Sequence, residues 1–116
     1  MEHLEKATKL TVFVDGDERS VHRPLYELVI DILREHKFAG VTLTRGAMSY
    51  SGRKLIHSAL NEVTMNDLPI IIEAVDVSEK TRTAAEQIAT FLGERGLVQI
   101  QPTTIVLHEN REGSES

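Results

Sequence analysis

Four stretches of the chain have the pattern of β-strands. In Lys9–Val14 and Val41–Arg45, apolar residues alternate with polar ones and β-branched residues are frequent, as in half-buried strands. Leu68–Val75 is an almost continuous apolar run, and Leu97–Leu107 is a fourth candidate that contains Pro102. Because proline cannot donate a hydrogen bond to a neighbouring strand, we expect Pro102 at a sheet edge or a bulge.

Two other stretches have the apolar spacing of helices. The first follows Pro24, which suits the first helical position because its missing N–H leaves no hydrogen bond unmade. It is expected to stop by Gly40, a candidate for the left-handed cap. Ser78 is expected to cap the second helix, which ends near Gly93 or Gly96. The two apolar stripes are Leu25, Leu28, Val29, Ile32 and Leu33, then Thr81, Ala85, Ile88, Ala89 and Leu92.

In chain order these elements predict an α+β, ferredoxin-like βαββαβ domain. Right-handed crossovers place both helices on one face of a four-stranded antiparallel sheet, with the first and third strands central. Residues 1–8 are expected to form a flexible leader and residues 9–108 the domain. Residues 109–116 have no apolar member and are expected to form a disordered acidic tail. A loop begins at residue 46, followed by a short helical turn at 55–60.

The third predicted strand is apolar on both of its sides, and this bears on assembly. Two helices cover only one face of the sheet, so Phe13, Ile71 and Val75 would be exposed on the other face. Such a patch usually marks an interface, which predicts a homo-oligomer joined through the open face. Scattered exposed aliphatic residues are the alternative reading. Glu73 lies among these residues, either as a paired interface acid or as a solvated residue of a channel between subunits.

Composition excludes several classes of protein. The chain has 116 residues, enough for one domain. Its net charge of −5, from 13 Lys and Arg against 18 Asp and Glu, argues against a protein that coats nucleic acid. Without cysteine it has no disulfide, thiolate metal site or cysteine nucleophile. No apolar run approaches the length of a membrane span and no signal-peptide pattern is present, which predicts a cytoplasmic protein without membrane insertion.

Residues 36–61 contain no Asp or Glu, although the chain as a whole is acidic. The centre of this window combines three cations with glycines and serine hydroxyls. Small residues let backbone N–H groups approach an anion, and arginine offers two donors to a phosphate. The window therefore predicts a phosphate or nucleotide loop, with a solvated hairpin as the alternative; the spacing of a P-loop is absent. The candidate residues are Arg45, Gly46, Ser49, Ser51, Arg53 and Lys54, with His22 and Arg23 at the first helix start.

The sequence assigns no catalytic set and no metal site. No two histidines lie four residues apart on a helix face, which argues against a metal centre. Ser49 or Ser51 near His57 lacks a third group to orient the base. His22 has the alternative role of a solvated residue at a helix start. We therefore expect a protein that is not an enzyme and requires no cofactor.

Several short motifs, in this order, resemble one family. They are Val14–Asp17 (VDGD), Arg23–Val29 (RPLYELV), Gly40–Gly46 (GVTLTRG), Ile56–Ala59 (IHSA) and Asp67–Glu73 (DLPIIIE). Over residues 8–107 they together resemble the family filed as domain of unknown function 190, which is similar to the PII signalling superfamily. The resemblance implies a trimer with its sheets turned inward. It also implies a loop between the second and third strands, here 46–60, shorter than in true PII proteins.

The resemblance further implies a function. PII-type proteins bind adenine nucleotides in clefts between subunits and change the shape of this loop to control an enzyme or a transporter. Here it implies an ATP, ADP or AMP effector, with Arg45, Arg53 and Lys54 holding phosphates. The family's Gly-aromatic-Gly element is replaced by Ser49–Ser51 (SYS), so hydroxyls stand where glycines are usual. The alternative is a nucleotide-independent module whose loop docks directly on a transporter or enzyme.

Overall fold

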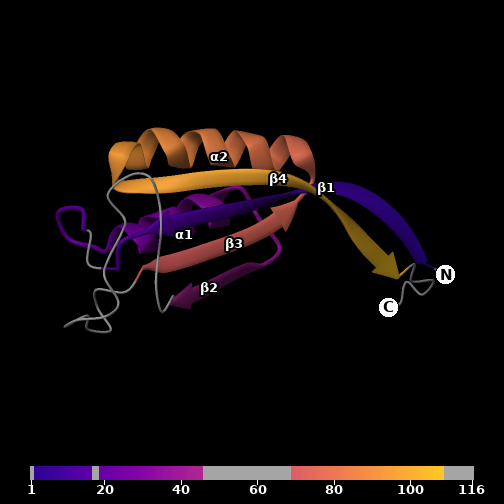
Figure 1. Cartoon of the computed structure of the whole chain (residues 1–116), viewed down its shortest axis with the longest axis horizontal. Helices are drawn as coiled ribbons and strands as arrows, with labels where there is room; N and C mark the ends of the chain where they lie inside the picture. Colours follow the sequence, from indigo (N-terminus) through magenta and orange to yellow (C-terminus); the bar gives the residue numbers. More distant parts are fainter. Residues whose placement is uncertain (1, 17–18, 46–68, 109–116) are drawn as a thin grey trace.

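The elements follow one another in the predicted order βαββαβ (Figure 1). The structure is a computed structural model that describes residues 2–16, 19–45 and 69–108. The predicted helical turn at 55–60 and the predicted tail at 109–116 lie outside these residues. The elements are β1 (Glu2–Val14), α1 (Leu25–Glu35), β2 (Val41–Arg45), β3 (Ile70–Asp76), α2 (Ser78–Leu92), the short 3₁₀ helix η2 (Gly93–Arg95) and β4 (Gly96–His108).

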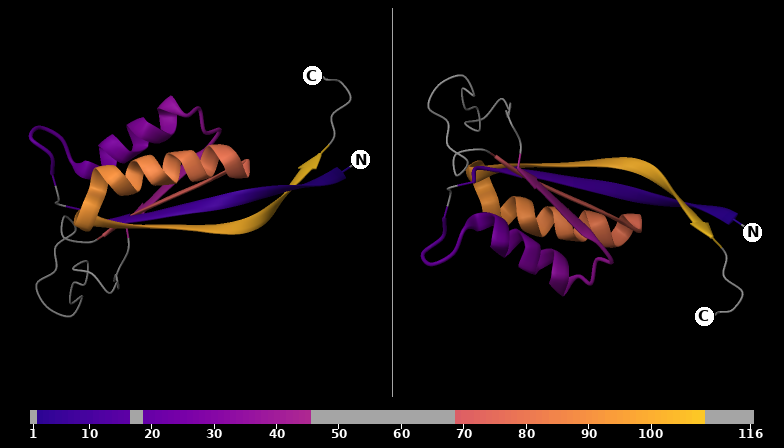
Figure 2. Two further views of the ribbon diagram at one scale, coloured as in Figure 1. Left: turned by 90° about the horizontal axis from the view of Figure 1, so that it is seen from above. Right: turned by 90° about the horizontal axis from the view of Figure 1, so that it is seen from below.

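The four strands form one antiparallel sheet in the order β2-β3-β1-β4. The first and third strands are therefore central, and β4 lies at an edge, as Pro102 predicts. Both helices pack on one face of the sheet (Figure 2), in agreement with right-handed crossovers. The ferredoxin-like prediction is thus confirmed. The other face carries no helix in the described part of the chain, and we call it the open face.

The core lies between the sheet and the two helices. Along β1, alternate side chains point at the helices because successive residues of a strand face opposite sides. Burying each large aliphatic side chain stabilises the fold by about 1.5–3 kcal/mol. The fully buried aliphatic residues of the core include Leu10, Val12 and Val14 of β1, Leu25, Val29 and Leu33 of α1, Ile70 and Ile72 of β3, and Ile88 of α2.

Strand β1 begins at Glu2, so residues 2–8, predicted as a leader, belong to the sheet. Residues 2–7 pair with residues 103–108 of β4, from Glu2 opposite His108 to Ala7 opposite Thr103. We call this two-stranded ribbon the arm; it projects beyond the ends of both helices (Figure 1). The local sequence does not predict this part of the strand because its residues are mostly polar. It forms because hydrogen bonds to the 13-residue strand β4 satisfy its backbone N–H and C=O groups.

Helix α1 ends earlier than predicted, and Gly40 is not its cap. Lys37 adopts the left-handed conformation, with φ of 63°, whereas Gly40 has no positive φ. The Lys37 N–H donates to the Arg34 carbonyl (2.9 Å) and the Phe38 N–H donates to the Leu33 carbonyl (3.2 Å). These two bonds form a Schellman motif. The prediction failed because a left-handed lysine is uncommon, whereas glycine is usual there.

Helix α2 begins one residue away from its predicted cap. Val77 occupies the N-cap position, and Ser78 is the first helical residue. The Ser78 hydroxyl oxygen accepts a hydrogen bond of 2.7 Å from the Thr8 hydroxyl, which ties the helix to β1. At its other end α2 stops at Leu92, and Gly93 takes a left-handed φ of 59°. Of the two predicted stops, Gly93 is therefore the one used.

Candidate functional site

The structure brings three of the predicted anion-binding residues to one end of the sheet. Strand β2 finishes at Arg45, and α1 starts just after His22 and Arg23, at the end where β1 finishes (Figure 1). We call this the loop end; it comprises residues 15–16, 19–24, Arg45, Pro69 and 93–95. The other members of the prediction lie outside the described residues: Gly46, Ser49, Ser51, Arg53 and Lys54.

Arg45 and Pro69 flank the part of the chain in which the anion loop is predicted. Arg45 is the last residue of β2, is half-buried, and lies opposite Ile70 in β3. Pro69 directly precedes β3 and is fully buried. Because β2 and β3 are neighbouring antiparallel strands, Arg45 and Pro69 lie at the same end of the sheet.

His22 lies in a turn that closes on itself before α1. The Ser20 N–H donates to the Arg23 carbonyl (2.9 Å), and the Arg19 guanidinium donates to the His22 carbonyl (3.3 Å). Residues 19 and 24 also form a β-bridge. The turn leaves His22 and Val21 on the surface, with Val21 84% exposed. His22 is therefore accessible at the loop end.

Arg23 precedes α1 and is engaged by two acids of that helix. Its guanidinium lies 2.8 Å from the Asp31 carboxylate and 3.2 Å from that of Glu27. The hydrogen bond to Asp31, followed by that to Glu27, raises the pKa of this exposed arginine above its ordinary value. A phosphate at this position would compete with both carboxylates for the same donors.

Arg95 is a further cation at the loop end, and it was not among the residues predicted from the sequence. Its guanidinium donates to the Phe91 carbonyl (2.7 Å) and to the Leu92 carbonyl (3.2 Å). It therefore covers carbonyl groups that the end of α2 leaves without helical partners. A basic residue directly after a helix stop at Gly93 is the signal that indicates this role.

The open face carries the predicted patch. Phe13 and Ile71 are half-buried, and Val75 is 37% exposed, although all three lie on central strands. Glu73 lies among them and forms an ion pair of 3.3 Å with Lys9. Glu73 is thus paired within the chain, and its two predicted roles between subunits stay predictions.

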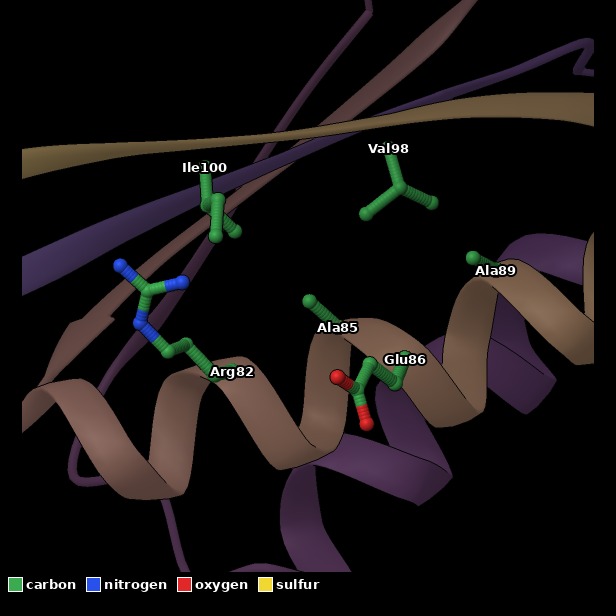
Figure 3. Close-up of a pocket in the computed structure, with 6 residues that line it drawn as sticks. All are labelled: Arg82, Ala85, Glu86, Ala89, Val98 and Ile100. Atoms are coloured by element: carbon green, nitrogen blue, oxygen red, sulfur yellow. The ribbon is translucent and has the colours of Figure 1, made fainter.

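A groove between α2 and the edge strand β4 is shown in Figure 3. Val98 and Ile100 point from β4 toward the helix, Ala85 points back at them, and Arg82 reaches toward Ile100. With a volume of about 230 Å³, the groove is smaller than the roughly 300–1,000 Å³ of usual small-molecule sites. Within one chain it is too small and too apolar for a nucleotide.

Residues 2–16, 19–45 and 69–108 contain neither a cluster of metal ligands nor a membrane-spanning helix. No group of three or more His, Asp or Glu side chains gathers there as a metal ion would require. No described helix combines the length and apolar character that crossing a membrane requires.

The sequence matches the profile of the DUF190 family, described as Uncharacterized ACR, over residues 7–105. A UPF0166 protein from Aquifex aeolicus is 24% identical over 101 residues, which cover 87% of this chain and 94% of that protein. A second UPF0166 protein, from Methanocaldococcus jannaschii, is 23% identical over 107 residues, which cover 92% and 98%.

Solved structures show the same fold. CPII, a nitrogen regulatory PII-like protein from Thiomonas intermedia K12, superposes with a TM-score of 0.68 in a form bound to ADP, AMP and bicarbonate. That match is 19% identical and covers 89% of this chain and 91% of CPII. A PII-like signaling protein from Thermus thermophilus gives a TM-score of 0.60 at 12% identity, covering 90% and 91%. These similarities establish a PII-like fold.

Proposed function

Because this chain belongs to the DUF190 family and has the PII-like fold, we propose that it is a regulatory protein that binds an adenine nucleotide. The observation that carries the proposal is the match to CPII, a protein of the same fold that was solved with ADP and AMP bound. The cationic window of the sequence supports it, since phosphates require such donors.

We further propose that the chain assembles as a trimer through its open face. The support is the apolar character of the central strands on that face, where neither described helix lies over Phe13, Ile71 and Val75. The ion pair of Lys9 with Glu73 adds to this, because paired charges are less costly to bury than single ones. Such an assembly would place the loop end of one chain near a neighbour.

In this proposal the nucleotide lies between two chains at the loop end. Arg45 contacts the phosphates from the end of β2, and Arg53 and Lys54 supply further positive charge, while His22 approaches from the turn before α1. Binding alters the shape of the 46–60 loop and thereby its fit to a transporter or an enzyme.

A thermal-shift panel tests this function. ATP, ADP and AMP, each with and without bicarbonate, are compared with GTP and inorganic phosphate on the purified protein. A ligand at 100 times its dissociation constant stabilises the folded state by about 2.7 kcal/mol, so the proposal expects a clear rise in Tm with at least one adenine nucleotide. A confirmed trimer with no rise at millimolar ligand contradicts it. Partner capture that is independent of nucleotide and lost on deletion of 47–53 supports the interaction module instead.

A further inference from the structure

The arm leaves one edge of β1 open. Asp76, the last residue of β3, pairs with Thr8, so β3 ends where the arm begins. Within the described part of the chain, residues 2–7 pair with β4 on one side and with no strand on the other. Unpaired N–H and C=O groups along a strand edge are a template for another strand.

The arm also exposes apolar side chains that the rest of the sheet keeps covered. Leu4 is 67% exposed, and Val106, directly opposite it on β4, is 60% exposed. Because side chains alternate along a strand, Leu4 lies on the same face as Leu10 and Val12, which the helices cover. Helix α2 reaches only the base of the arm, where Ser78 lines a pocket with Lys6 and Ala7, and the arm projects beyond both helices (Figures 1 and 2). A two-stranded ribbon is only marginally stable by itself, so this pair needs a cover.

We propose that the open edge of residues 2–7 pairs antiparallel with the same edge of a second copy of this chain, with Leu4 opposite Leu4. The amino-acid order in the arm, Glu2-His-Leu-Glu-Lys6, is self-complementary in this register. It sets Glu2 opposite Lys6 and His3 opposite Glu5, twice each, because a two-fold axis relates the copies. Opposite charges at facing positions stabilise antiparallel pairs.

The neighbouring registers are less favourable, which makes this one specific. A shift by two residues in one direction sets Glu5 opposite Glu5, and a shift in the other direction sets Glu2 opposite the apolar Leu4. Like charges directly opposite each other destabilise a sheet. A shift by one residue would place the Leu4 side chains of the two copies on opposite faces of the joined sheet, so that they no longer meet. Charge and apolar pattern therefore favour the same register.

In the proposed pairing a row of four apolar residues crosses both arms. Val106 and Leu4 of one copy meet Leu4 and Val106 of the other, on strands about 4.8 Å apart. The arms project from the end of the sheet opposite Arg45 (Figure 1). Pairing therefore leaves the loop ends of both copies uncovered, so this inference does not rest on nucleotide binding. Two open-face trimers joined in this way would give a particle of six chains.

The first test compares particle masses by light scattering and sedimentation. Leu4→Asp places two carboxylates at the centre of the pairing, and the expected result is half the wild-type mass. Leu43→Asp is the matched control, because Leu43 is also exposed, 42%, but lies on β2, the edge strand on the other side of the sheet; its mass should equal that of the wild type. Halving is expected whether the wild type falls from six chains to three or from two to one, so failure of the trimer does not hide this result. An unchanged mass in Leu4→Asp overturns the proposal.

The second test exchanges charges across the pairing. Glu2→Lys sets lysine opposite lysine in its own pairing, and Lys6→Glu sets glutamate opposite glutamate. Each variant alone should dissociate at least tenfold more readily than the wild type. An equimolar mixture sets every lysine opposite a glutamate and should restore the wild-type mass. A mixture no tighter than its components overturns the proposed register.

Discussion

The Nζ atom of Lys9 lies 3.3 Å from the Oε2 atom of Glu73, across the two central strands and on the open face of the sheet. The pair is diagonal, because Lys9 faces Val75 and Glu73 faces Thr11 in the β1–β3 ladder. The two side chains are 37% and 40% exposed. Such a pair contributes little in solvent, but it allows the face to be covered without leaving a single charge buried.

Val75→Glu tests whether this face is the interface. Val75 stands directly opposite Lys9 and is 37% exposed, so a glutamate there is tolerated by the single chain. In an assembly the extra carboxylate would be buried near Glu73, and the expected result is loss of the assembly. Sedimentation of wild type and variant at the same protein concentration should show this dissociation as a threefold fall in particle mass from that of a trimer.

Leu43→Glu is the matched control for that experiment. Leu43 is 42% exposed but lies opposite Ile72, on the face that the helices cover. It should leave the mass unchanged while circular dichroism confirms the fold of both variants. Dissociation by Leu43→Glu with none by Val75→Glu would place the interface at the β2 edge instead.

Lys37→Gly should stabilise the protein. A non-glycine residue in the left-handed region costs roughly 1–2 kcal/mol, and glycine removes that cost while losing roughly 0.5–1 kcal/mol of chain entropy. We therefore expect the free energy of unfolding in urea to rise by about 0.5–1 kcal/mol. Gly40→Ala should not destabilise, since Gly40 has no positive φ and nothing within 4 Å of an added Cβ. The reverse ranking would restore Gly40 as the residue that ends the helix.

Asp76→Asn should reduce stability in a pH-dependent manner. Burial raises the pKa of Asp76, but hydrogen bonds from the Val77 N–H and the Lys80 ammonium, with its charge, outweigh burial and lower it. A carboxyl with a lowered folded-state pKa stabilises the fold above its unfolded value, near 3.8, and loses this contribution as pH falls through the folded value.

The comparison of Asp76→Asn with wild type is made by urea unfolding at pH 7, 5 and 3. Asparagine keeps the acceptor for the Val77 N–H but loses the charge that faces Lys80, 3.0 Å away. The expected deficit is about 1 kcal/mol at pH 7, similar at pH 5, and smaller at pH 3. A deficit that stays constant down to pH 3 would mean that the charge of Asp76 contributes nothing.

The strand order and the helix positions could be predicted from the sequence because each element carries its own period. Leu10, Val12 and Val14 alternate, and Leu25, Val29 and Leu33 repeat every four residues, so their burial follows from local pattern alone. The end of α2 at Gly93 was predictable for a different local reason, because glycine adopts a positive φ at low cost.

The arm and the helix caps were not predictable in this way. Residues 2–7 become a strand because β4 offers them a ladder, which is a long-range contact that their own polar pattern does not encode. Ser78 bonds to Thr8 rather than capping α2, again a contact between distant residues. At the candidate site, the position of Arg45 at the end of a strand was predicted correctly. The ion pairs of Arg23 were not predicted, because they depend on which side of α1 carries Glu27 and Asp31.

Titration of nucleotide by calorimetry is the most direct test of whether this protein binds an adenine nucleotide. ADP and ATP are titrated into the wild type, the Arg53→Ala/Lys54→Ala double variant and the control Arg34→Ala, whose arginine is 73% exposed on α1. We predict saturable binding of one nucleotide per chain in the wild type and the control. Loss of charge-assisted hydrogen bonds should weaken binding by the double variant at least tenfold, or about 1.4 kcal/mol. If the folded and assembled protein gives no heat of binding at millimolar nucleotide, it does not bind adenine nucleotides and the proposed function is wrong.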